Sequence, residues 1–219
     1  MIRRIPNQVI RIQHRHFHLD PSLTDVLILD TETTGFLPRG RMIQLAWRKY
    51  NSCGSDLISQ KSYLIAHSKP LVVPKSATDI HGFTAKDLKE HGVHIDEACE
   101  EFAKDLLTTK IVVGHNLNFD LSILYQELDI HYPHPKILSS LQGKLKVCTM
   151  INGPRTKTAN LKSVAGKGRF IGLKNMYQMV VGEVDPLLRL HNADADVLLT
   201  SELYFALLKL KDCEIVPRT

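Results

Sequence analysis

Apolar residues form short unbroken runs in the first part of the chain, and these runs predict strands. Residues 26–29, VLIL, are an unbroken apolar run rich in branched side chains, which is typical of a strand buried on both faces of a sheet. Residues 42–50 and 62–66 predict two further strands, separated by turn-forming residues at 51–55. The three segments together predict a meander.

Beyond Pro74 the pattern becomes mainly helical. Thr84 opens a short helix with Asp87 at its third position, close to a capping box, and residues 94–107 carry apolar side chains at helical spacing. Two more strands are predicted at residues 111–113 and 146–150, and further helices at residues 120–128, 160–165, 173–181 and 193–210. Strands first, then alternating helices and strands, predict an α/β domain in which helices flank a mixed five-stranded sheet.

Composition agrees with a folded domain. The chain has 219 residues, of which 43% are hydrophobic and 23% charged, so it has enough apolar material for a core and is not a disordered chain. With about 150 residues per domain as a prior, we expect one domain at residues 25–212, an N-terminal arm at 1–24 and a tail at 213–219. No segment reaches the ~18 consecutive apolar residues of a membrane span, which excludes a transmembrane protein.

The cysteines and the N-terminal arm bear on localisation. Cys53, Cys99, Cys148 and Cys213 are too far apart for a CxxC motif, so they are expected to be reduced thiols of an intracellular protein, cytoplasmic or nuclear. The arm is rich in Arg and His and weakly resembles a transit peptide, but it lacks serines and a clear helical apolar face. We therefore expect an extended arm rather than an organelle import signal.

The charge is unevenly distributed. The total is 28 basic minus 23 acidic residues, or +5, yet residues 130–182 contain nine basic residues and no Asp or Glu. The rest of the chain holds 19 basic and 23 acidic residues, a net charge of −4. One basic segment on a mildly acidic protein indicates a polyanionic partner, and a solvated lysine-rich surface explains the same counts equally well.

Two carboxylates lie at the end of the first predicted strand, in residues 29–35, LDTETTG. Side chains two residues apart on a strand face the same way, so Asp30 and Glu32 should lie side by side. Like charges this close repel or raise a pKa unless they share a cation, and hard divalent ions take such oxygen ligands. The alternative is that the strand has ended by Asp30 and both groups face water, the commoner case for an isolated pair.

Two further acidic motifs accompany predicted helix starts. In residues 112–120, VVGHNLNFD, an apolar strand runs into a loop and Asp120 begins a helix. In residues 191–196, HNADAD, His191 precedes the last helix and Asp196 lies in its first turns. Each alone fits an acid favoured by the helix dipole, with His191 as a loop residue. The order and spacing of all three motifs together do not fit that explanation.

In this order, LDTETTG, GHNLNFD and HNADAD resemble the three exonuclease motifs of the DEDDh family, which includes the proofreading epsilon subunit of bacterial DNA polymerase, three-prime repair exonucleases and oligoribonuclease. The family pattern is met by Asp30, Glu32, Asp120, His191 and Asp196. The sister class has a tyrosine where this chain has Asn192. Residues 80–84, IHGFT, also resemble a segment of epsilon-type members, and the resemblance covers residues 26–211.

This resemblance implies a ribonuclease H-like fold and the hydrolysis of phosphodiester bonds of DNA or RNA from the 3′ end. It implies two divalent ions, Mg²⁺ or Mn²⁺, with Asp30 bridging them and with Glu32 and Asp196 binding the ion that activates water. Asp120 is then a ligand of the other ion, and His191 is the general base, whose usual pKa near 6.5 suits that task.

Substrate contacts are implied as well. Six positions match those at which epsilon-like members contact the terminal nucleotide, namely Thr33, Phe36, Ile80, His81, Asn116 and Phe119. Core packing explains Phe119 equally well, and His81 also fits an ordinary loop histidine. The basic residues Lys167 and Arg169 are expected to hold upstream phosphates.

Two other classes of function stay open: a nucleic-acid-binding module that kept the fold without catalysis, and a metal-stabilised interaction domain. The complete set of five motif residues disfavours the first, and the basic segment disfavours the second. The expected partner is a nucleic acid with a free 3′ end, single-stranded at that end, and the N-terminal arm could dock a polymerase or another replication or repair protein. DNA and RNA are both candidates, because their discrimination depends on contacts to the sugar 2′ position.

Overall fold

The computed structural model describes residues 25–152 and 170–210 of the chain. The expected arm at 1–24, the helix at 160–165 and the tail at 213–219 lie outside the described residues, so they stay predictions. Within the described part, no helix is long and apolar enough to cross a membrane.

A meander of three antiparallel strands forms one half of the sheet, as the apolar runs predict. β1 (Asp25–Thr33) pairs with β2 (Met42–Tyr50), and β2 pairs with β3 (Leu57–Ala66). β3 begins five residues before the predicted strand, at Leu57. These added residues are mostly exposed, so they lack the buried apolar pattern from which a strand is recognised.

The other half of the sheet is parallel. β5 (Thr109–Gly114) pairs with β1, and β6 (Leu145–Cys148) pairs with β5. The sheet has six strands in the order β4-β3-β2-β1-β5-β6, so the predicted count of five was wrong. The added strand is β4 (Val93–His94), which is two residues long and pairs with the end of β3. Two residues are too few to show a strand periodicity in the sequence.

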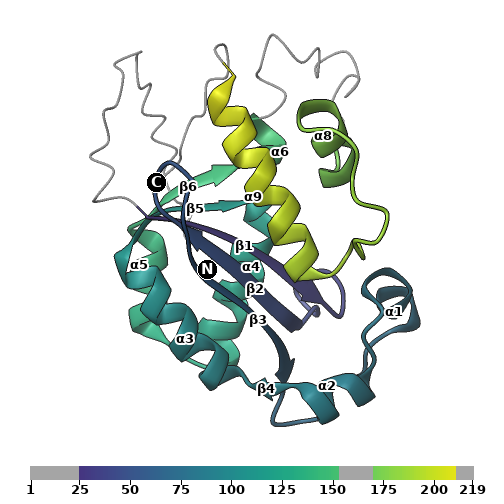
Figure 1. Cartoon of the computed structure of the whole chain (residues 1–219). Helices are drawn as coiled ribbons and strands as arrows, with labels where there is room; N and C mark the ends of the chain where they lie inside the picture. The colour runs from purple at the N-terminus through teal and green to yellow at the C-terminus, as the bar shows by residue number, and fades with distance from the viewer. Residues whose placement is uncertain (1–24, 153–169, 211–219) are drawn as a thin grey trace.

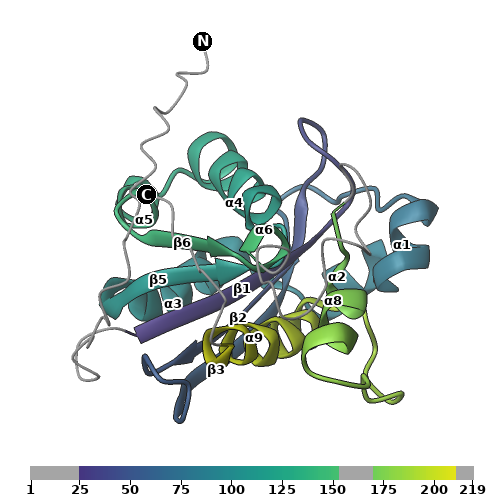
Figure 2. The ribbon, with the colours of Figure 1, turned by 90° about the horizontal axis from the view of Figure 1, so that it is seen from above.

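Helices cover both faces of the sheet (Figures 1 and 2). One face is covered by α3 (Ile95–Thr108), α4 (Leu117–Gln126) and α5 (Pro135–Gln142). The other face is covered by α9 (Ala193–Lys209), with α8 (Leu173–Val180) packed against α9. The remaining helical segments are short: α1 (Lys75–His81), α2 (Ala85–His91), the π-helical turn η1 (Glu127–His131) and α6 (Thr149–Asn152).

Alternate residues of β1 enter two different cores. Leu27 and Leu29 pack with the residues of α3 and α4, whereas Val26 and Ile28 pack with those of α9. All four are at most 1% exposed. The two covered faces explain why the apolar run at residues 26–29 shows no alternation. They also determine which way the next residues of β1 must point.

Packing of α3 against the sheet centres on an aromatic pair. The rings of Trp47 and Phe102 meet edge to face with centroids 5.3 Å apart, and both side chains are fully buried. The indole N–H of Trp47 donates to Asp105 at 2.7 Å, so the buried polar atom is satisfied. This contact joins α3 to the middle of the sheet.

Truncating Phe102 should therefore destabilise the whole domain. We expect Phe102→Ala to lower the free energy of unfolding by about 3–5 kcal/mol, because the cavity lies between a helix and the sheet. Leu107→Ala is the matched control on the same helix, since Leu107 is 72% exposed, and it should change stability by less than about 0.5 kcal/mol. Urea denaturation followed by circular dichroism measures both, and equal effects would contradict the assigned packing.

Candidate active site

The strand period places two carboxylates on the α9 side of the sheet. Asp30 and Glu32 follow Ile28 at spacing two, so they point to the same face as Ile28. Both are half-buried and belong to the regular part of β1, where they pair with Ala46 and Gln44 of β2. The strand has therefore not ended at Asp30, and the two groups do not simply face water.

A third carboxylate reaches the same place from the start of α9, which lies over the end of β1 (Figure 1). Carboxylate oxygens of Asp30, Glu32 and Asp196 lie within 4.8 Å of one another. Asp194, two residues earlier, turns away: it accepts from the amide of Gln60 at 3.1 Å and lies 3.9 Å from the guanidinium of Arg48. Of the two acids in HNADAD, only Asp196 joins this cluster.

Asp120 approaches the cluster from the opposite face. It lies in the first turn of α4 and is 2% exposed. Its Oδ1 accepts hydrogen bonds from the backbone N–H of Thr31 at 3.0 Å and from the Thr31 hydroxyl at 2.8 Å. Thr31 lies between the two β1 carboxylates and points the other way. One carboxylate oxygen of Asp120 is thus bonded to Thr31, and the other oxygen is available as a ligand.

The cluster is electrostatically unfavourable by itself. Burial raises the pKa of Asp30 well above its usual range, and the charges of Asp120, Asp196 and Glu32 raise it further. Burial followed by repulsion raises the pKa of Glu32 to about 8. Burial also raises the pKa of Asp120 to about 7, against the hydrogen bonds from Thr31, and that of Asp196 to about 6, against the neighbouring His191.

The donor set fits a hard divalent cation. Among the described residues, no Lys or Arg forms an ion pair with any of the four carboxylates. Oxygen ligands without thiolate or imidazole favour Mg²⁺ or Mn²⁺ over zinc. Asp30, Glu32 and Asp196 could hold such an ion directly, and it would favour the ionised form of each. Three of the four predicted ligands thus lie together, whereas Asp120 is not part of this cluster and is bonded to Thr31.

His191 lies beside Asp196 in an uncommon backbone conformation. Its φ is 58°, in the left-handed region, and its side chain is exposed. The other described non-glycine residue with positive φ is Asn116, at 68°. Each comes just before a helix that carries a site carboxylate, α9 or α4. Such conformations are uncommon outside glycine and concentrate at functional sites.

Gln44 of β2 was not recognised from the sequence, yet it fixes the start of α9. Its Oε1 accepts from the backbone N–H of Ala193 at 2.9 Å, and its Nε2 donates to Asn192 Oδ1 at 3.3 Å. Gln44 is buried and lies opposite Glu32 in the strand register. One side chain therefore ties the carboxylate strand to the helix of Asp196. The sequence does carry one indication of this role, because Gln44 is the single polar residue in the apolar segment 42–47, MIQLAW.

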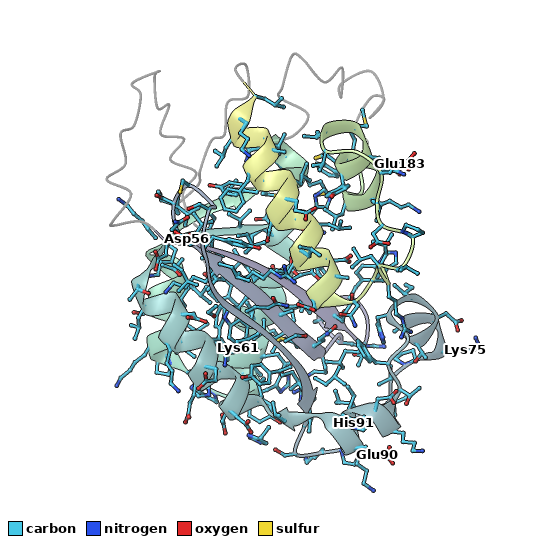
Figure 3. All side chains as sticks on the ribbon, in the orientation of Figure 1. Asp56, Lys61, Lys75, Glu90, His91 and Glu183 are labelled. Carbon is cyan, nitrogen blue, oxygen red and sulfur yellow. The ribbon has the colours of Figure 1, made fainter. Side chains whose placement is uncertain are left out.

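Three predicted apolar nucleotide contacts lie around this end of the sheet. Phe36, in the loop after β1, is 84% exposed, and Ile80 on α1 is 59% exposed. Phe119 packs partly against the core and meets the ring of Phe36 edge to face, with centroids 6.0 Å apart. The core packing considered for Phe119 is thus present, and its contact with a nucleotide stays a prediction. Two charged side chains of α1 face solvent. Lys75 points away from the sheet in Figure 3, and its Nζ lies 2.6 Å from the Asp79 carboxylate.

The three predicted polar contacts differ in their surroundings. Asn116 is exposed, and the Thr33 hydroxyl donates to the carbonyl of Gly35 at 2.9 Å. His81 is 2% exposed, its Nδ1 accepts from the Phe83 N–H at 3.0 Å, and the ring also interacts with the backbone of Thr33. His81 is therefore not an ordinary solvated loop histidine. The expected phosphate contacts Lys167 and Arg169 lie outside the described residues.

The raised pKa values predict a pH-dependent stability that divalent ions reverse. Carboxyls of the unfolded chain titrate near pH 4, whereas those of the folded site titrate as high as about 8 for Glu32. Between these limits the folded state binds more protons, so stability without divalent ions should fall as the pH rises from about 4 to 8. Adding Mg²⁺ should raise the melting temperature, and more so at pH 8 than at pH 6.

Asp30→Asn tests the origin of this effect. Removing one of the repelling charges should raise the melting temperature in EDTA at pH 8, by about 2–4 °C for each kcal/mol of relief. The same variant should lose the stabilisation by Mg²⁺. Thermal denaturation of both proteins at two pH values measures this, and an unchanged response of the variant to Mg²⁺ would contradict a metal site at Asp30.

Known proteins share this architecture. The RNase T family model, described as exonuclease, matches residues 27–204. Similar solved structures include E. coli exonuclease I in complex with a dT13 oligonucleotide, with a TM-score of 0.66 and 16% identity over 86% of this chain and 42% of that one. A moderately thermophilic exonuclease I from Methylocaldum szegediense gives a TM-score of 0.61 and 19% identity over 86% and 41% of the two chains.

The likeness to these structures is one of fold, and this chain spans less than half the length of the exonuclease I chains. No curated protein sequence gives a match. The family match covers the three acidic motifs and the whole sheet from β1 onward. The expected ribonuclease H-like fold and the recognition of the DEDDh motifs are thus confirmed, and the chain belongs to the exonuclease family.

Proposed function

We propose that the protein is a metal-dependent 3′–5′ exonuclease that releases mononucleotides from the 3′ end of DNA or RNA. The observation that carries this proposal is the convergence of Asp30, Glu32 and Asp196 within 4.8 Å. Family membership supports the reaction class. A catalytically silent module would have no use for this buried repulsion, which lowers the stability of the fold.

Four carboxylates would hold two divalent ions. Asp30, Glu32 and Asp196 would hold the ion that activates water, and Asp30 and Asp120 would hold the other. Bound there, the ions would neutralise the phosphodiester charge and lower the pKa of the attacking water. Because Thr31 holds one oxygen of Asp120, this residue offers a single oriented oxygen, which suits a ligand that acts through one atom.

His191 would act as the general base. It would accept the proton of the attacking water as the new bond from water oxygen to phosphorus forms. The bond from phosphorus to the 3′ oxygen then breaks, the leaving oxygen takes a proton from solvent, and a 5′-mononucleotide is released. His191 is exposed and adjacent to Asp196, so it can return its proton to water after each cycle.

The surroundings support a strand that is unpaired at its 3′ end. Phe36, in the loop that follows β1, and Ile80 of α1 expose apolar surface, and aromatic rings stack on bases of any sequence. The matching E. coli exonuclease I structures contain the oligonucleotides dT13 and dA16. We propose the same class of ligand, a single strand with a free 3′ end, for this chain.

A matched set of labelled strands tests the direction and the metal requirement. We expect 3′-labelled single-stranded oligonucleotides to release labelled mononucleotide at once in Mg²⁺ or Mn²⁺, while 5′-labelled strands shorten stepwise. The same assay with DNA and RNA of one sequence compares the two sugars. Chelation by EDTA should stop the reaction. Release from the 5′ end, or activity that persists in EDTA, would overturn the proposal.

His191→Ala separates the base from the metal ligands. Loss of a general base lowers kcat by about 10²–10⁴-fold, and this variant should keep the Mg²⁺-induced rise in melting temperature. Asp196→Asn should lose both turnover and the Mg²⁺ effect. Asp194→Asn is the matched control from the same helical turn, because Asp194 bonds to Gln60 instead. Wild-type turnover by His191→Ala would remove the histidine from the mechanism.

A further inference from the structure

A cavity of about 190 Å³ adjoins His191 and one of the site carboxylates, Asp196. One wall consists of His191 and Asp196 at the start of α9. The facing wall is the start of α8, with Lys174 and Asn175, and the lining between them includes the apolar side chains of Leu173 and Leu190. The cavity thus sets a cationic wall opposite the site of the proposed hydrolysis.

Two hydrogen bonds of the half-buried His115 hold the α8 wall in place. His115 directly follows β5. Its Nε2 lies 3.0 Å from the carbonyl oxygen of Ile171, and its Nδ1 lies 2.9 Å from the hydroxyl oxygen of Thr149. Burial lowers the pKa of His115 to about 4, so the ring is neutral at pH 7. Its Nε2–H therefore donates to Ile171, and Nδ1 accepts from Thr149. Ile171, one residue before the cavity wall, is 4% exposed.

The next turn of α8 is fixed against α9. Met176 and Tyr177 are buried among Leu199, Leu203 and Leu207, and the Tyr177 hydroxyl donates to Glu202. Figures 1 and 2 both show α8 alongside α9, and Glu183 lies beyond α8 at the outer surface in Figure 3. The backbone that carries Lys174 and Asn175 is therefore anchored on both sides.

Lys174 and Asn175 themselves are unengaged. Both are exposed, and neither forms a hydrogen bond or ion pair with any described residue, Asp196 included. Lys146 belongs to the same acid-free segment, residues 130–182, and is placed differently, because it donates to the carbonyl oxygens of Gln142 and Lys144. Lys174 therefore presents a free charge within reach of a ligand in the cavity.

We propose that Lys174 and Asn175 form a subsite for the phosphate one step upstream of the scissile phosphodiester. This proposal rests on the proposed exonuclease function. A lysine provides charge and an asparagine amide provides a directional donor, and such contacts position a nucleic acid without reading its sequence. A dinucleotide has no upstream phosphate and cannot use the subsite. The enzyme should therefore prefer strands of three or more nucleotides over dinucleotides.

Lys174→Gln tests the subsite with two substrates. On a trinucleotide, kcat/KM should fall roughly tenfold to a hundredfold, as expected for a lost hydrogen bond between charged groups. On the dinucleotide, which contains the scissile bond alone, it should stay within about twofold of wild type. A trinucleotide with a neutral methylphosphonate at the upstream position should lose the wild-type advantage and be insensitive to the substitution.

Lys209→Gln is the matched control, because Lys209 is exposed and lies at the far end of α9 from His191. It should leave kcat/KM on both substrates within about twofold of wild type. The slope of log binding constant against log salt for the trinucleotide should become shallower by about 0.7 in Lys174→Gln, the value for one contact to a single strand.

Three results would overturn the subsite: equal losses on both substrates, no loss on the trinucleotide, or a full effect on the methylphosphonate. Equilibrium binding of labelled trinucleotide in EDTA gives a readout that needs no turnover. There, Lys174→Gln should bind the trinucleotide roughly tenfold more weakly than wild type, and unchanged binding would also overturn the subsite. Failure of the wild-type protein to cleave either strand in Mg²⁺ or Mn²⁺ would instead count against the proposed function.

Discussion

Repulsion among carboxylates at the end of a buried strand is the constraint on which the site depends. Helices cover both faces of β1. Asp30 and Glu32 follow its buried residues, so they lie at the edge of the core, where water is partly excluded. Burial and mutual repulsion raise the pKa values of both groups. Without a cation the site is most stable when protonated, and with divalent ions it can be ionised and ready to meet a phosphate. The fold thus loses stability at the place where the proposed metal site lies.

Local backbone geometry and buried polar bonds bring the remaining groups to this point. Asn116 and His191 adopt left-handed conformations just before α4 and α9. Thr31 orients Asp120 from one face of the sheet, and Gln44 ties the start of α9 to the strand next to β1. These contacts are buried, so they resist solvent competition and hold the functional atoms with little freedom. A frame of this kind suits the electrostatic preorganisation that the proposed hydrolysis would need.

The acid-free segment acquires a more specific meaning from the structure. Its charge total fitted a polyanionic partner and a solvated surface equally well, and Lys146 of β6 is engaged by backbone carbonyls. Lys174 lines the cavity that contains His191 and Asp196. Position therefore matters more than the sum of charges, because a phosphate interacts strongly only with cations within a few ångströms. The same distinction separates Asp194, which pairs with Gln60, from Asp196.

The sequence by itself determined the strand order of the meander, the α/β class and the three acidic motifs, because these follow from local periodicity and residue spacing. Tertiary structure alone decided the sixth strand β4, the role of Gln44, the different partners of Asp194 and Asp196, and the place of Lys174 beside His191. Each of these depends on residues far apart in the chain, and the pairings of side chains across elements leave no periodic trace in the sequence. Motif spacing identifies which groups can react, and packing determines which of them meet.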